Sequence, residues 1–165
     1  MRGVIAVAGG GLEIRLSVRE RDLLRSLPQQ LRPLLAGEEP APTLTGRLYP
    51  AGYDDPDMEA EYQELAGSDI KAQRLAALDA FDATLAEGTV TRGRWAVTLD
   101  SEQAEAWLSA VNDARLILGG LLGITEESQW EDGPSEDNPA SVVMYYLGWL
   151  QEDLVAGLME ALPGA

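Results

Sequence analysis

Three polar residues interrupt an apolar segment and are the side chains best placed to do chemistry. Asn112, Asp113 and Arg115 stand at the centre of "WLSAVNDARLILGGLLGI", which otherwise contains mainly Leu, Ile, Val, Ala, Gly and Trp. A carboxylate whose pKa is raised by apolar surroundings could act in catalysis if a cleft reached it. The same side chains could instead form a polar clamp that fixes how helices pack.

Positions on a helical wheel favour the clamp. In a helix over about residues 101–123, Arg115 falls on the apolar face, whereas Asn112 lies on an opposite side made mostly of small residues. An isolated buried charge is costly, so Arg115 needs a partner on another helix. Arg74 has the same requirement because it lies on an apolar line of its own helix. We therefore predict a structural clamp without a catalytic role, made of Glu61, Arg74, Asn112, Asp113 and Arg115.

Two acidic segments could bind a hard cation, because Ca²⁺ and Mg²⁺ take carboxylate oxygens. Residues 54–64 begin with five acids in eight positions, but they lack the spacing of an EF-hand loop. Acidic residues are also favoured at a helix N-terminus by the helix dipole, and we prefer this interpretation to a metal site. The second segment, residues 126–137, surrounds Trp130. It is expected to be a solvated loop, with Trp130 as a possible interaction anchor.

Residue types that are missing exclude several mechanisms. The chain has no cysteine and no histidine, and its single lysine is Lys71. Disulfides, zinc fingers, cysteine nucleophiles and histidine-based triads are therefore excluded. We expect no cofactor, although an enzyme that combines carboxylates with a divalent cation stays open as an alternative.

The charge is strongly negative and unevenly spread. The formal net charge is −16, and residues 51–165 hold 23 acidic against five basic side chains. Such a surface repels phosphate backbones, so nucleic acid is not the favoured partner. No apolar run approaches the ~18 residues that a membrane span needs, and the N-terminal residues resemble a strand more than a signal peptide. We expect a cytoplasmic protein without membrane contact.

Arg21, Arg25 and Arg32 form a narrow basic stripe beside the apolar face of an early helix. Such a stripe could contact DNA, but no aromatic residues accompany it. An intramolecular or dimeric meeting with the acidic half of the chain is the more natural interpretation.

Hydrophobic periodicity and capping signals predict one mainly helical α+β domain over residues 1–165. Its strands form a small three-stranded antiparallel sheet and are expected at residues 4–8, 12–16 and 92–99. About five or six helices pack around the buried helix at about 101–123. The other helices are expected from Ser17 to about residue 35, with a kink or split at Pro28, and then at 56–66, 69–87 and 139–162. Long loops are expected at 37–56 and 125–138.

A weak internal repeat relates two parts of the chain. Aligning Ile14 with Val97 also pairs Leu16 with Leu99 and Arg32 with Arg115. Each copy consists of a strand, a capping signal and an amphipathic helix. The match could come from a duplication or from the sequence signals that any strand followed by a capped helix shares. In both cases we expect two similar units whose strands meet in one sheet.

Two stretches, "LYPAGYDDPDMEAEYQEL" and "WLSAVNDARLILGGLLGI", resemble an uncharacterised actinobacterial family, a domain of unknown function. Genes of that family often neighbour the gene of ClpS, the adaptor that delivers substrates to the Clp protease. The resemblance implies no catalytic residues. Where a basic residue is expected near "LGGLLGI", this chain has Gly120 and Leu121.

The leading hypothesis is a non-enzymatic cytoplasmic protein-interaction or regulatory protein, homodimeric and with a protein partner. A link to Clp-dependent proteolysis follows from the resemblance alone. The alternatives are the cation-dependent carboxylate enzyme and a DNA-binding regulator that uses the basic stripe.

Overall fold

Four antiparallel strands form the sheet, in the order β1-β2-β4-β3. In the computed structural model, which describes residues 3–37, 54–121 and 139–162, they are β1 (Val4–Ala6), β2 (Leu12–Ser17), β3 (Thr89–Thr91) and β4 (Arg94–Leu99). Leu12, Ile14 and Leu16 alternate along β2 and are buried, so one face of the sheet belongs to the core.

The helices follow the sheet in two groups. The first contains α1 (Val18–Arg25), α2 (Leu27–Ala36), α4 (Pro56–Tyr62), the π-helical turn η1 (Gln63–Gly67) and α5 (Ser68–Glu87). The second contains α6 (Ser101–Leu121) and α7 (Pro139–Ala161). With α4, η1 and α5 counted as one continuous segment, the described residues form five helical segments.

Local chemistry explains where the first helices begin and end. Ser17 and Glu20 form a reciprocal capping box, in which each side chain accepts a hydrogen bond from the other residue's backbone N–H. The predicted split of this helix is confirmed: α1 ends at Arg25, and Pro28 lies in the first turn of α2, where its missing N–H costs little. Gly37 ends α2 with a φ of 74°.

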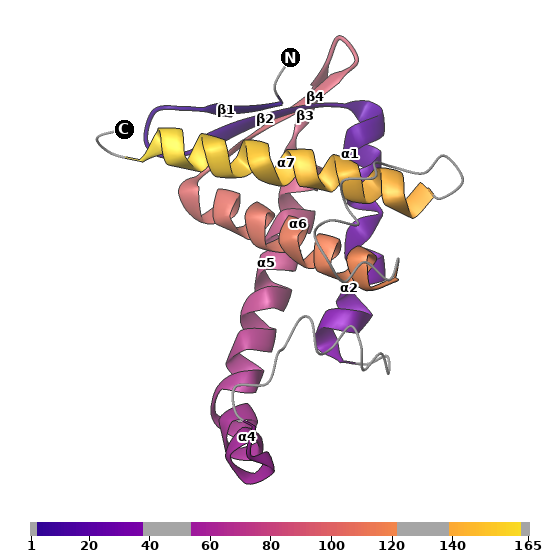
Figure 1. The fold of residues 1–165 in the computed structure, drawn as a ribbon. Helices are drawn as coiled ribbons and strands as arrows, with labels where there is room; N and C mark the ends of the chain where they lie inside the picture. The colour runs from indigo at the N-terminus through magenta and orange to yellow at the C-terminus, as the bar shows by residue number, and fades with distance from the viewer. Residues whose placement is uncertain (1–2, 38–53, 122–138, 163–165) are drawn as a thin grey trace.

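The long helices lie on one side of the sheet (Figure 1). Helix α7 runs across the sheet beside β1 and β2, and α6 packs against α7 and also contacts β4. Helix α5 packs against α6 and extends away from the sheet, with α4 at its far end. Thus α6 contacts both other long helices, and the prediction of a central buried helix is confirmed.

Aromatic rings fill the core between the sheet and the helices. Trp95 of β4 and Trp107 of α6 are stacked with centroids 6.4 Å apart, and the ring of Phe81 meets Trp107 edge-on at 4.8 Å. The indole Nε1 of Trp107 donates a hydrogen bond to Thr84 Oγ1 at 2.7 Å. These contacts join β4, α5 and α6.

The predicted fold class is confirmed, but the sheet has four strands instead of three. The strand that was missed is β3, which pairs with β4 across a tight turn in which Arg92 and Gly93 have φ values of 55° and 76°. All three residues of β3 are exposed, so no apolar alternation marks it. A second difference is η1, which joins the two helices expected at 56–66 and 69–87. Of the predicted loops, residues 38–53 and 125–138 lie outside the described part of the chain.

The two units of the internal repeat meet in the sheet, as predicted. Strands β2 and β4 pair in antiparallel fashion, and Ile14 and Val97, the residues aligned in the repeat, are direct partners. Each of these strands belongs to a hairpin with an outer strand and leads into a helix. The sheet order therefore has the arrangement of a two-fold repeat.

Candidate functional site

Asp113 is the most unusual polar residue of α6. It is 2% exposed, and its Oδ1 accepts a hydrogen bond from Nη1 of Arg74 on α5 at 2.9 Å. Burial raises the pKa of Asp113 to about 6, and the positive charge of Arg74 opposes this rise only in part. The pair ties α5 to α6.

Asn112 and Arg115 point to a different helix. Arg115 Nη1 donates to Gln151 Oε1 of α7 at 2.5 Å, and Gln151 Nε2 donates to Asn112 Oδ1 at 3.4 Å. The structure thus brings the "NDAR" side chains into two connections, one from α6 to α5 and one from α6 to α7. The sequence analysis did not predict Gln151 as a partner, because Gln151 precedes Glu152 and Asp153 and this polar run is typical of a solvated segment. Its signal is its place between Leu150 and Leu154, which are both buried.

Glu61 is not part of the hydrogen bonds given above for the described residues, and its place in the clamp stays a prediction. It lies exposed on α4, 13 residues before Arg74 along one helical segment. The prediction placed Glu61 and Arg74 on two separate helices, at 56–66 and 69–87, whereas η1 joins α4 to α5.

The predicted basic stripe is divided between two helices. On α1, Arg21 bonds its sequence neighbour Asp22 at 2.8 Å, and Arg25 is exposed. On α2, Arg32 donates to Asp79 of α5 and lies 3.8 Å from Asp82. The structure therefore places Arg32 against acidic residues of the same chain. Trp130 lies outside the described residues.

A surface groove follows the line where α6 and α7 meet. One hollow of about 500 Å³ lies between the first half of α6 and the last turns of α7, and a second of about 360 Å³ continues toward the other end. Both hollows are lined by Val155 and Met159, so they form one groove. Further lining residues are Gly10, Ser101, Glu105, Leu108, Leu158, Ala161 and Leu162 in the first hollow and Arg115, Gln151, Glu152 and Ala156 in the second.

Large apolar side chains are exposed along α7 and beyond its C-terminal end. We use "α7 face" for Val142, Trp149, Val155, Met159 and Leu162, which are 50%, 72%, 38%, 63% and 61% exposed. Val155, Met159 and Leu162 line the same hollow, whereas Val142 and Trp149 are separate exposed apolar positions toward the start of α7. Several exposed large apolar side chains on one helix are typical of interaction sites.

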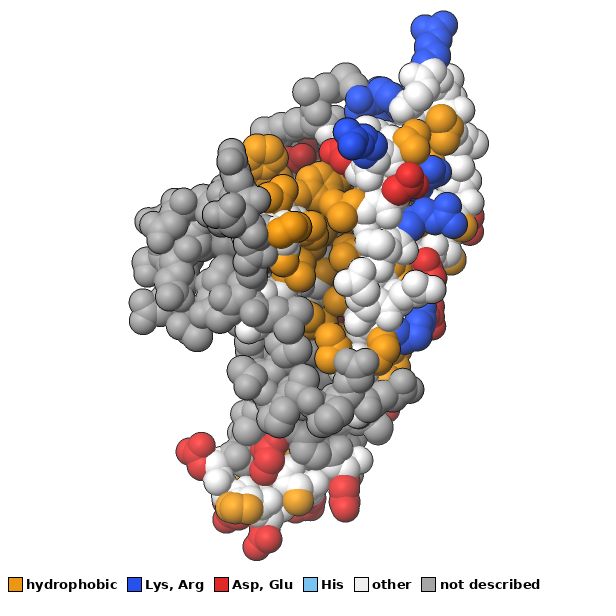
Figure 2. Space-filling model, turned by 90° about the vertical axis from the view of Figure 1, so that its right-hand side faces the viewer, with side chains coloured by type: hydrophobic (Ala, Val, Ile, Leu, Met, Phe, Trp, Pro, Cys, Tyr) orange, Lys and Arg blue, Asp and Glu red, His pale blue; other side chains and the backbone are white. Residues whose placement is uncertain are grey.

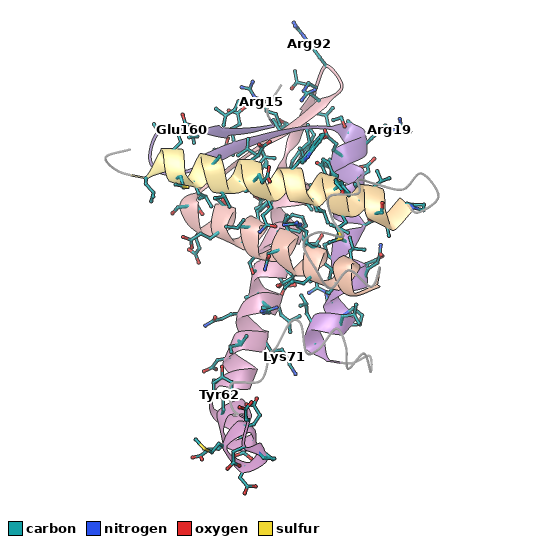
Figure 3. The ribbon with its side chains drawn as sticks, in the orientation of Figure 1. Arg15, Arg19, Tyr62, Lys71, Arg92 and Glu160 are labelled. Atoms are coloured by element: carbon teal, nitrogen blue, oxygen red, sulfur yellow. The ribbon has the colours of Figure 1, made fainter. Side chains whose placement is uncertain are left out.

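The charges beside the groove are mainly negative. Glu105 and Glu152 line it, and α7 carries three acidic residues and no basic one. Basic side chains gather elsewhere: Arg15, Arg19 and Arg92 lie around the sheet and the start of α1 (Figure 3). Figure 2 shows basic groups along the upper part of one face and acidic groups at its lower end, where α4 lies.

Two further observations concern the described residues. They contain no group of three or more acidic side chains arranged to hold a metal ion. Among the helices that the structure describes, none is both long enough and apolar enough to cross a membrane.

Comparison with known proteins gives one match. The family model "Domain of unknown function (DUF2017)" matches residues 1–158. No curated protein and no solved structure matches the chain.

Proposed function

The chain belongs to the DUF2017 family of domains of unknown function. From the exposed side chains of its surface, we propose that it is a non-enzymatic protein-interaction module. The observation that carries this proposal is the exposed α7 face beside the α6–α7 groove. Trp149 is 72% exposed, and indole is among the side chains most enriched at the centres of protein interfaces.

The polar network supports an architectural role in this module. Asp113 has the raised pKa that a general acid or base needs, but Arg74 engages one of its oxygens and the residue is 2% exposed. The groove is lined by Arg115 and Gln151 and does not include Asp113 among its lining residues. We therefore assign the network to holding α5, α6 and α7 together.

A link to Clp-dependent proteolysis is the finer form of this proposal. Its support is the family resemblance in "LYPAGYDDPDMEAEYQEL" and "WLSAVNDARLILGGLLGI", because genes of that family often neighbour the ClpS gene. The module would then act in a regulatory capacity beside the adaptor or the protease.

Site-specific photocrosslinking in cells of the source organism tests the proposal. A photoreactive phenylalanine analogue is placed at Trp149 and, as the matched control, at Val90, which is 53% exposed on β3. We expect protein adducts from position 149 that are absent or at least tenfold weaker from position 90. Mass spectrometry of the adducts then asks whether Clp components are among them.

Two results would contradict the proposal. Equal adducts from both positions would show that the α7 face has no special role. A complete lack of adducts from position 149 in cells that express the protein would remove the interaction function from this face. Adducts without Clp components would refute only the proteolysis link.

A further inference from the structure

We infer that the α6–α7 groove receives a basic amphipathic α-helix of a partner protein. This inference rests on the proposed interaction function and specifies the chemistry of the partner. It follows from the shape of the groove, its charges and the poor fit of the other possible occupants.

The groove has the length and walls that suit a helix. On the α7 side the lining residues run from Gln151 to Leu162, along and just beyond α7, and this separation of 11 residues spans about 17 Å of helix, or about three turns. Apart from Gly10 and Leu162, its lining residues belong to α6 and α7, whose backbone hydrogen bonds are made within each helix. A partner strand would find no free sheet edge there, whereas an amphipathic helix can place its apolar face between two helices.

The charges beside the groove indicate a basic helix. Glu105 on one wall and Glu152 on the other lie where the flanking residues of a bound helix would lie. The one basic residue that lines the groove, Arg115, donates a hydrogen bond to Gln151. Lys and Arg beside an apolar stripe would complement this surface.

A second copy of this chain fits the same surface poorly. Pairing of the groove with the groove of another copy would bring Glu105 and Glu152 of both copies together. Like charges across an interface oppose association. The predicted homodimer would therefore need a different surface.

Binding of a model peptide to the full chain tests the inference. The probe is a fluorescein-labelled, 14-residue helical peptide with Leu at i, i+3, i+4, i+7 and equivalent positions and Lys elsewhere. Two comparison peptides have Glu in place of every Lys, or the same composition with the Leu periodicity scrambled. We expect fluorescence anisotropy to give at least tenfold weaker binding for both comparison peptides.

Matched variants show whether binding occurs in the groove. The double variant Glu105→Gln/Glu152→Gln removes two charges beside the groove, and Asp57→Asn/Glu61→Gln removes two from exposed positions of α4. Both variants have the same net charge. We expect the groove variant to weaken the basic peptide at least fivefold and to reduce the dependence of its affinity on salt, and the α4 variant to leave both nearly unchanged. Met159→Ser, at a 63% exposed position, should weaken binding at least tenfold without affecting the fold.

Each other outcome overturns the inference in a recognisable way. Equal losses from the two double variants would show unspecific attraction to an acidic protein. Preference for the acidic peptide, or equal binding of the scrambled one, would refute a basic amphipathic helix while leaving crosslinking at Trp149, and with it the proposed function, intact. Concentration-dependent dimerisation in sedimentation that Met159→Ser abolishes would make a second copy the occupant.

Discussion

Arg74 of α5 and Asp113 of α6 form an ion pair in which the carboxylate is almost fully buried and the guanidinium is partly exposed. Only one carboxylate oxygen is engaged by Arg74, and Oδ2 has no hydrogen-bond partner within the described residues. Because the lost hydration of the carboxylate is only partly replaced, its charged form is disfavoured in the folded protein.

The stability of the protein should therefore contain a pH-dependent contribution from Asp113. Its pKa is about 6 in the folded state and ~3.9 in the unfolded chain, so the folded state binds the proton more tightly. This contribution is fully present below pH ~4, is lost as the pH rises from ~4 to ~6, and amounts to about 3 kcal/mol. Asp113→Asn cannot titrate and lacks it.

Urea unfolding at several pH values, followed by tryptophan fluorescence, measures this effect. The free energy of unfolding of the wild type minus that of Asp113→Asn should fall by about 2 kcal/mol between pH 4 and pH 7, where most of the titration occurs. The other carboxylates are common to both proteins and largely cancel in this difference. A constant difference, or one that rises with pH, would show that Asp113 is not held in its protonated form by burial.

Removal of Arg74 should be costly because it leaves the buried carboxylate without its cation. We expect Arg74→Met to lower the free energy of unfolding by about 3–5 kcal/mol at pH 7, and by less at pH 5, where Asp113 is neutral. The double variant Arg74→Met/Asp113→Leu removes both charges and should recover most of the loss. If the double variant is as unstable as the single one, the packing of Arg74 matters more than its charge.

Arg115 should stabilise the contact between α6 and α7. Arg115→Met removes the hydrogen bond to Gln151 and should lower the free energy of unfolding by about 1.5–3 kcal/mol. Arg19→Met, at an exposed position of α1, serves as control and should change stability by less than ~0.5 kcal/mol. Thermal unfolding of both variants is sufficient for this comparison, and a fully stable Arg115→Met protein would refute the clamp.

Patterns that are local in sequence predicted most of the fold. Alternation in β2 and the capping box at Ser17 depend on neighbouring residues, and both occur as expected. The internal repeat predicted that the strands of its two units meet in one sheet. In the structure Ile14 and Val97, which the repeat aligns, are direct partners. Strand β3 was missed because its three exposed residues have no buried partner face, and pairing with β4 alone defines it.

The contacts of the polar network were harder to predict because they join residues of different helices. The need of Arg74 and Arg115 for partners could be inferred from their apolar surroundings, but the identity of the partners depends on how helices cross. Asp113 meets Arg74 from another helix, and Gln151 meets Arg115 across α6 and α7. From the sequence, the apolar helix expected at 139–162 could be core or a dimer face, and the choice between them depends on neighbours that the sequence does not show.

The hydroxyl of Thr84 should be essential to the core. It accepts a hydrogen bond from Trp107 Nε1 and lies 2.9 Å from the backbone oxygen of Phe81, to which it donates. Thr84→Val keeps the shape but leaves the indole N–H unpaired, at a cost of about 1–3 kcal/mol. Thr84→Ser keeps the hydroxyl and should lose less. Urea unfolding compares the two, and equal stability of Thr84→Val and the wild type would show that this bond contributes nothing.

Gly157 sets how closely α7 approaches the sheet. A Cβ at this position would lie 3.0 Å from Val4 of β1 and 3.0 Å from Leu12 of β2, closer than ordinary packing allows. Gly157→Val adds two further methyl groups and should cost about 1–3 kcal/mol, because α7 must move away from the hairpin. Ala156→Val makes a β-branched residue at the neighbouring exposed position and should cost less than ~0.7 kcal/mol. Helix propensity favours Val over Gly, so a loss of stability in Gly157→Val, measured by chemical unfolding, is due to the contact between α7 and the sheet. Unchanged or higher stability of Gly157→Val would contradict the close approach.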